Sequence, residues 1–370
     1  LSEYSGKPLL RRHWLSISVM GLTAKCDLTN ENAQYPYCAS PAAAIIFSVL
    51  FGVTFAGHLA LAILYRKKFC WVIIVGSGWE CLGLIMRAYS TLDQTKSSTL
   101  AAAQLLVLLA PLWINAFVYM IFGRMVYYYT PNKKIKGIKA ESMAKIFIWL
   151  DITAFIIQGT GGILDSDGFG EKLNRTGMNI YTAGIAIQEF FILCFLALLI
   201  VFHKRMLSGY RNIERGNGWK WMVYGMYVTL LCLTTRIVYR LVEFANPNQA
   251  GKTVLSTKEA PFYILECVPI CIGMMLWNAL HPGRIMPGPD SEFPKLSRAE
   301  KKQMKQEAKE AKKQRRVGFS QKYTAVNDSE YTLTRPSDEE RETGYGGGRW
   351  PLNEVESGRR GYGNEYGYVR

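Results

Sequence analysis

Histidine is scarce in this sequence of 370 residues, which contains only four. His13 lies before the first apolar run, His58 lies within it, and His203 and His281 lie at the ends of two later runs. A catalytic zinc site needs several His or carboxylate side chains that converge on one point. Four histidines spread in this way do not readily form such a site, so the sequence argues against a membrane metallohydrolase.

Motifs for nucleotide hydrolysis and for nucleophilic catalysis are also absent. The sequence contains neither a G-x-x-x-x-G-K-[ST] phosphate-binding loop nor a G-x-S-x-G nucleophile elbow. The first absence excludes ATP-driven pumping by this chain alone, and the second argues against a serine hydrolase. We therefore expect a protein that is not an enzyme and needs no cofactor.

Long apolar runs dominate the sequence that is present. A helix that crosses a bilayer needs about 20 apolar residues, and seven runs reach this length. Hydrocarbon cannot satisfy exposed backbone groups, and a barrel would show short alternating segments instead. The sequence therefore predicts an all-α polytopic membrane protein with seven transmembrane helices. The predicted spans are Pro41–Tyr65, Phe69–Tyr89, Thr99–Tyr127, Met143–Leu164, Gly177–His203, Trp219–Phe244 and Ala260–Leu280.

The lysines and arginines of the loops predict the orientation, because cytoplasmic loops carry an excess of both. One set of alternate loops holds eleven: Arg66, Lys67, Lys68, Lys133, Lys134, Lys136, Lys139, Lys204, Arg205, Arg211 and Arg215. The other set holds five: Lys96, Lys172, Arg175, Lys252 and Lys258. We therefore expect the N-terminus outside and the C-terminus in the cytoplasm. Four basic residues before the first span argue mildly in the other direction.

The predicted spans divide the chain into three parts. We expect an extracellular segment at residues 1–40, a seven-helix domain at 41–283 and a basic cytoplasmic tail at 284–370. Residues 295–316 contain ten Lys or Arg, which favours contact with anionic inner-leaflet lipid at about 1 kcal/mol for each positive residue. The alternative is a solvated charged helix that helps to fix the topology. Residues 318–370 lack any periodic pattern and are predicted to be disordered. We expect no nucleic-acid partner.

Two features of the predicted outer segments fit this orientation. Cys26 and Cys38 are the two cysteines outside the spans and their edges, and a disulfide between them would close a short loop in an oxidising compartment. Two free thiols are the alternative. A glycosylation sequon begins at Asn174, in the predicted loop between the fourth and fifth spans. A second sequon, at Asn327, falls in the predicted cytoplasmic tail, where it would remain unused.

Every span holds or ends on a residue that hydrocarbon disfavours. A charge at the bilayer centre costs about 3 kcal/mol or more, so such side chains usually face a polar interior or pair with one another. Spacing supports a shared interior, because residues separated by four or seven positions lie on one face of a helix. The candidate substrate-binding residues are Glu80, Arg87, Asp151, Gln158, Gln188, Glu189, Arg236, Arg240, Glu243 and Glu266.

These residues also permit a structural interpretation. Interhelical ion pairs and amide bonds fix helix packing without touching a substrate. Residues near the span ends, such as Arg87, Arg124 and Glu243, can extend to the membrane interface instead.

Sequence blocks around these residues resemble the fungal lipid-translocating exporter family. They include F-G-V-T-F-A-G-H ending at His58, W-E-C-L-G-L-I-M-R ending at Arg87, W-L-D-I-T-A-F-I-I-Q around Asp151, and R-I-V-Y-R-L-V-E-F from Arg236. The resemblance covers roughly residues 41–283. It implies a seven-span protein of the plasma membrane, associated with resistance to toxic sterols and with release of sphingoid long-chain bases. The chain departs from the family pattern at Leu84 and at residues 112–114, which leaves the substrate open.

We therefore expect an exporter of amphipathic lipids, either sphingoid bases or similar toxic amphiphiles. An amine on the substrate would need a carboxylate partner, for which Glu80, Asp151 and Glu266 are the candidates, while the arginines balance charge or hold a phosphate or hydroxyl group. The alternative is a seven-helix receptor or sensor that regulates a lipid or stress response. Against it, the third span ends in F-G-R-M-V rather than D-R-Y, and N-P-x-x-Y is missing from the seventh.

Overall fold

The computed structural model describes residues 15–19, 22–26, 35, 37–92, 97–164, 170–209, 216–244, 254–288 and 291–293, with scattered residues between 299 and 314. Within these residues, seven helical segments are long and apolar enough to cross a membrane. The predicted fold class is therefore confirmed. The crossing helices are α1 (Pro41–Tyr65), α2 (Trp71–Leu92), α3 (Ser97–Tyr129), α4 (Ala140–Leu164), α5 (Glu171–Leu207) and α6 (Trp219–Phe244). The seventh crossing joins a π-helical turn, η3 (Phe262–Cys267), to α8 (Val268–Ala279).

The helices extend further than the predicted spans at several ends. The limits of α1 and α6 agree with the prediction, but α5 begins at Glu171 rather than Gly177 and continues to Leu207. Apolar runs mark only the part of a helix that lies in hydrocarbon, whereas backbone hydrogen bonds continue through polar residues beyond it. Asn174 therefore lies in the first turn of α5, and its predicted position in a loop is wrong.

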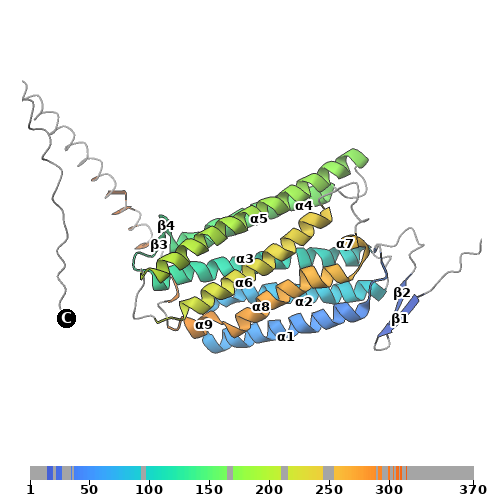
Figure 1. Ribbon diagram of the computed structural model, residues 1–370, viewed down its shortest axis with the longest axis horizontal. Coiled ribbons are helices and arrows are strands. Elements are labelled where there is room, and N and C mark those ends of the chain that lie inside the picture. The colour runs from blue at the N-terminus through green and yellow to red at the C-terminus, as the bar shows by residue number, and fades with distance from the viewer. Residues whose placement is uncertain are drawn as a thin grey trace, which may run out of the picture. The chain divides into compact units, whose positions relative to one another are not determined.

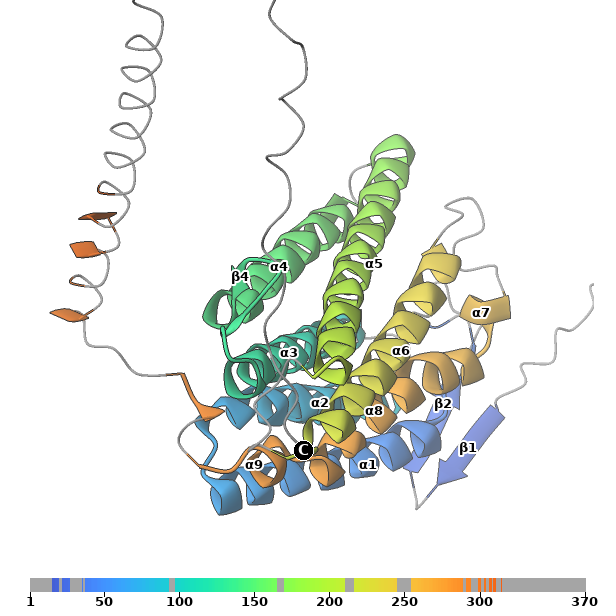
Figure 2. The same cartoon turned by 60° about the vertical axis from the view of Figure 1, so that its left-hand side comes forward.

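The crossings form a closed ring in chain order, as Figures 1 and 2 show. Each of α1 to α6 packs against the next helix, α6 packs against α8, and α8 returns to α1. Among the seven, α3 buries the largest share of its apolar window, and it also contacts α6 across the ring. Large apolar side chains such as Val53, Trp149 and Leu231 remain exposed on the outside, where lipid would surround them.

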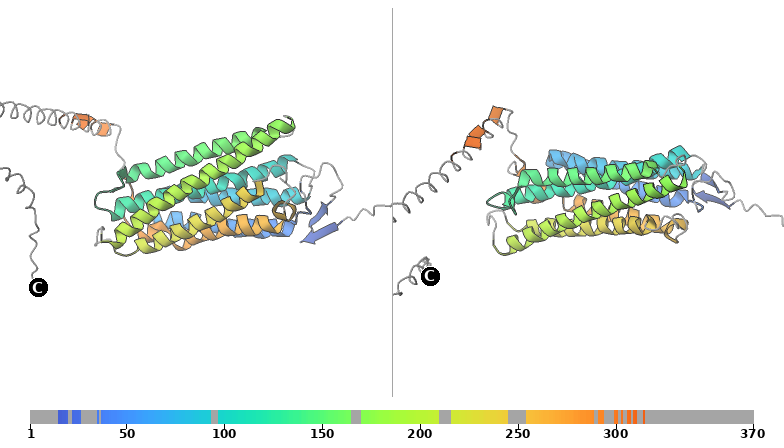
Figure 3. Two further views of the ribbon diagram at one scale, coloured as in Figure 1. Left: turned by 45° about the horizontal axis from the view of Figure 1, so that its top comes forward. Right: turned by 90° about the horizontal axis from the view of Figure 1, so that it is seen from above.

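Shorter elements precede, connect or follow the crossings (Figure 3). The strands β3 (Lys134–Ile135) and β4 (Ile138–Lys139) form a hairpin between α3 and α4. Its two-residue turn places Lys136 and Gly137 at φ angles of 48° and 83°, the left-handed conformation that a tight hairpin requires. The strands β1 (Leu15–Val19) and β2 (Leu22–Cys26) pair before the first crossing. The helices η1 (Lys68–Cys70), α7 (Val254–Thr257) and α9 (Pro282–Ile285) are short.

The chain divides into two compact units, Leu1–Phe293 and Pro294–Arg370. All seven crossings belong to the first unit. Most of the basic segment 295–316, all of 318–370 and the sequon at Asn327 lie outside the described residues. The three-part division predicted from the sequence, the lipid contact and the disorder therefore stay predictions.

Candidate functional site

Glu266 lies in the π-helical turn η3, which widens the seventh crossing. The N–H of Val268 donates to the carbonyl of Tyr263, five residues earlier. The cause is Pro269, which lacks an N–H and whose ring clashes with the carbonyl four residues before it. Such turns are rare and occur frequently at functional sites. The turn holds the Glu266 side chain in the interior, where it is only 1% exposed.

Two arginines of α6 bind the Glu266 carboxylate. Arg236 Nη2 lies 3.0 Å from Glu266 Oε1, and Arg240 Nη2 lies 2.6 Å from Glu266 Oε2. Arg240 Nη1 also pairs with Glu243 Oε2 at 3.0 Å. The predicted face of α6 thus turns toward the seventh crossing. Arg236 donates in addition to the carbonyl of Val107 on α3, at 3.2 Å, so the cluster links three crossings.

Two residues of α2 complete the charge balance of this cluster. Glu80 is buried and interacts electrostatically with Arg236, Arg240 and Glu266. Arg87, two turns further along the same face of α2, attracts Glu266 electrostatically. Three carboxylates and three guanidiniums therefore share one region of the interior, which allows their charges to cancel.

Arg87 is buried, which does not fit the alternative that its side chain extends to the membrane interface. Its guanidinium donates to the hydroxyls of Tyr37 at 2.8 Å and Tyr263 at 3.4 Å, and it lies 3.9 Å from the ring centre of Phe262. These groups belong to the segment before α1 and to η3. The hydrogen bonds and the cation–π contact replace the water that the charge loses.

The chain before α1 is held against the start of the seventh crossing. The N–H of Ser40 donates to both carboxylate oxygens of Glu259, at 2.9 and 3.1 Å. Burial raises the pKa of Glu259 above its ordinary value, although this hydrogen bond and Arg87 act in the opposite direction. Cys38 lies in this segment and is disulfide-bonded. The side chain of Cys26 is outside the described residues, so the pairing of the two cysteines stays a prediction.

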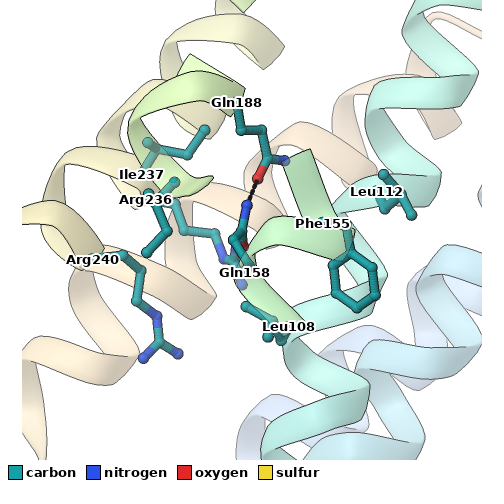
Figure 4. Close-up of a pocket in the computed structure, with 9 residues that line it drawn as sticks. Leu108, Leu112, Phe155, Gln158, Gln188, Arg236, Ile237 and Arg240 are labelled. Carbon is teal, nitrogen blue, oxygen red and sulfur yellow. Dashed lines mark hydrogen bonds between the residues drawn. The ribbon is translucent and has the colours of Figure 1, made fainter. Parts of the chain in front are cut away.

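A pocket opens beside the arginines, between α3, α4, α5 and α6 (Figure 4). Its space of about 380 Å³ counts the open mouth and all gaps between atoms, and the part that a water molecule can enter is only about 10 Å³, roughly room for a single water. Gln158 Nε2 of α4 donates to Gln188 Oε1 of α5 at 2.9 Å on its wall. The polar lining is Gln158, Gln188, Arg236 and Arg240, and the apolar lining is Leu108, Leu112, Phe155, Ile185 and Ile237.

Asp151 and Glu189 do not line this pocket. Asp151 Oδ2 accepts hydrogen bonds from Asn115 Nδ2 at 2.9 Å and from the hydroxyl of Tyr119 at 3.1 Å, both on α3. Glu189 Oε1 accepts from Thr234 of α6 at 2.9 Å. None of these three partners was predicted from the sequence, although an Asn in an apolar run is itself a signal of a polar interior. No three His, Cys, Asp or Glu side chains among the described residues are grouped to hold a metal ion.

A ring of seven apolar helices around a buried charged cluster and a polar-lined pocket defines an integral membrane protein with a polar interior. The model of the family described as "RTA1 like protein" matches residues 73–289. The chain belongs to this family, the fungal lipid-translocating exporters that its sequence blocks resemble.

Several relatives carry transporter or exporter names. The chain is 40% identical over 275 residues to "Probable lipid transporter atnI" of Emericella nidulans, covering 72% of this chain and 71% of the relative. It is 24% identical over 286 residues to "Lipid-translocating exporter-like protein RTA1" of Leptosphaeria maculans, covering 72% and 54%. It is 22% identical over 287 residues to "Sphingoid long-chain base transporter RSB1" of Saccharomyces cerevisiae, covering 68% and 73%. No solved structure matches the chain.

Proposed function

We propose that this protein translocates amphipathic lipids across a membrane and that its pocket binds the lipid headgroup. The pocket carries this proposal, because it sets guanidinium and amide groups beside five apolar side chains within the ring of crossings. The pocket is narrow as it stands, so a headgroup enters it only when the surrounding helices move apart. The acyl or alkyl chain would remain against the apolar outer surface of the helices. The transporter names of the relatives support the same role, and none of them names an enzyme reaction.

The pocket lining favours a headgroup that carries oxygen atoms. Arginine and glutamine side chains donate hydrogen bonds, and hydroxyl or phosphate oxygens accept them. Glu266 already pairs with two guanidiniums, so we assign to Glu266 and Glu80 the role of balancing the arginines. Sphingoid long-chain bases are the substrates we propose first, bound through their hydroxyl groups, and resistance to toxic amphiphiles follows from their release. Their ammonium group would stay outside this pocket, because Glu80 and Glu266 are engaged by the arginines.

Replacing both pocket glutamines with Leu should slow transport roughly tenfold, because the headgroup loses hydrogen bonds of about 0.5–1.5 kcal/mol each. Apolar replacement of both partners leaves neither amide unpaired, so the fold should survive. The measurement is transfer of a fluorescent long-chain base by the purified full chain in vesicles, comparing wild type with Gln158→Leu/Gln188→Leu. The control is Thr160→Val, since Thr160 is exposed on α4 and bonds only to its own helix.

Two results would count against this proposal. A folded double variant that transports at the wild-type rate would show that the pocket does not bind the headgroup. A purified wild-type protein that moves no lipid, although its deletion changes lipid export in cells, would favour a receptor or sensor instead.

We further propose the plasma membrane as its location, with the N-terminus outside, because release of an amphiphile from the cell requires that membrane. The loop charges support the orientation. An epitope after residue 370 should then remain unlabelled in intact protoplasts and become labelled once they are permeabilised. An epitope in residues 1–14 should be labelled in both. Labelling of the C-terminal epitope in intact cells would overturn the orientation, and with it the outer disulfide and the use of Asn174.

A further inference from the structure

Asp151 is a buried carboxyl group, and one of its two oxygens accepts no hydrogen bond from the described residues. Asp151 is only 1% exposed, and Oδ2 accepts both of its hydrogen bonds. Oδ1 finds no donor among the described residues, and neither does Oδ1 of the neighbouring Asn115. Buried acceptors without donors are uncommon in folded proteins, and each needs a physical explanation.

Among the described residues, no positive charge acts on Asp151 to neutralise a carboxylate. The helices packed against α4 are α3 and α5. From α3 come Asn115 and Tyr119, which are both uncharged, and from α5 the nearest acid is Glu189, which acts electrostatically on Tyr119. The strand β4 contacts the beginning of α4, where Lys139 is exposed and twelve residues before Asp151 in the chain. An ionised carboxylate in a dry interior without a counter-ion is strongly disfavoured, and such a group takes up a proton instead.

Aromatic rings pack beside Asp151 on the side of Tyr119. The ring of Tyr119 lies 4.6 Å from that of Phe195 and 5.3 Å from that of Phe147, and these two rings are 5.2 Å apart. The hydroxyl of Tyr119 bonds to Asp151, so this aromatic cluster lies next to the carboxyl group. The pocket is lined by Gln158, two turns further along α4, and not by Asp151.

We propose that Asp151 is a proton-binding site and that movement of this proton is coupled to lipid transport. The proton binds to Oδ1, where it removes the charge and supplies a donor. Asp151 and Gln158 share one face of α4, so a shift of this helix against α3 changes the pocket and the carboxyl environment together. When such a shift lets water reach Asp151, the proton leaves toward the side of the membrane to which the site has opened. The coupling rests on the proposed lipid transport, whereas the proton site does not.

Infrared spectroscopy of the full chain in phosphatidylcholine vesicles tests the proton site without any transport. At neutral pH, wild type should show the carbonyl stretch of a protonated carboxyl group, and Asp151→Asn should lose that part of the band. The asparagine keeps an oxygen for Asn115 and Tyr119, so the fold should survive. Glu141→Gln is the control, because Glu141 is an exposed acid on the same helix and should leave the band unchanged. An identical band in wild type and Asp151→Asn would overturn the proton site.

A pH gradient across the same vesicles tests the coupling. The rate of transfer of the fluorescent long-chain base should change several-fold with the direction of the gradient in wild type and Glu141→Gln, but not in Asp151→Asn. An equal response in Asp151→Asn would overturn the coupling. A wild-type protein that shows the infrared band and moves no lipid would contradict the proposed function and the coupling, and would uphold the proton site.

Discussion

Replacing Glu266 with Gln is expected to destabilise the protein by about 3–5 kcal/mol, because removal of one partner leaves a buried charge uncompensated. Arg240 keeps Glu243 as a partner, so Arg236 is the residue that loses its ion pair. Its remaining hydrogen bond, to the carbonyl of Val107, involves no full charge, and Glu80 is left as the carboxylate that acts on it electrostatically. The measurement is the unfolding temperature of the purified protein, together with its abundance at the cell surface.

A second substitution separates charge from shape in this experiment. The pair Arg236→Met/Glu266→Gln removes one charge of each sign, and it should recover most of the stability that Glu266→Gln loses. A double variant no more stable than the single variant would contradict the ion-pair account. A Glu266→Gln variant that is as stable as wild type would contradict this account as well. Because the single variant is expected to be less abundant, a loss of lipid tolerance in cells must be corrected for abundance before it is assigned to the site.

Replacing Gly161 with Ala is expected to cost about 3 kcal/mol through overpacking between α4 and α5. An added Cβ would lie 2.3 Å from the backbone nitrogen of Tyr181 and 2.7 Å from the carbonyl oxygen of Gly177. Both atoms belong to the backbone of α5, so the clash is relieved only if the helices separate. The same two helices hold the Gln158–Gln188 pair, and transport should therefore fall with stability.

The neighbouring glycine provides a matched control. A Cβ on Gly162 meets no atom within 4 Å, so Gly162→Ala should be neutral or should stabilise the helix by about 0.5–1 kcal/mol. Comparing the unfolding temperatures of the two variants isolates the helix contact from the change in helix propensity. Equal temperatures for Gly161→Ala and Gly162→Ala would show that this close approach does not hold α4 and α5 together.

The sequence by itself determined the seven crossings, because a bilayer demands about 20 apolar residues in a helix whatever its neighbours are. It also determined which polar residues share a face. The spacing of Arg236, Arg240 and Glu243 puts them on one stripe of α6, and the structure places that stripe against the seventh crossing. Both results follow from the geometry of a single helix, which depends only on local backbone hydrogen bonds.

The tertiary structure decided which residues meet. Glu80, Asp151 and Glu266 looked alike in the sequence as acids in apolar runs. In the fold, Glu266 pairs with two arginines, while Asp151 meets Asn115 and Tyr119 instead. The widened turn at η3 sets the direction of Glu266, and close contacts such as that of Gly161 set the distance between helices. Rotation and separation of helices arise from side-chain packing between segments far apart in the chain, which no local pattern encodes.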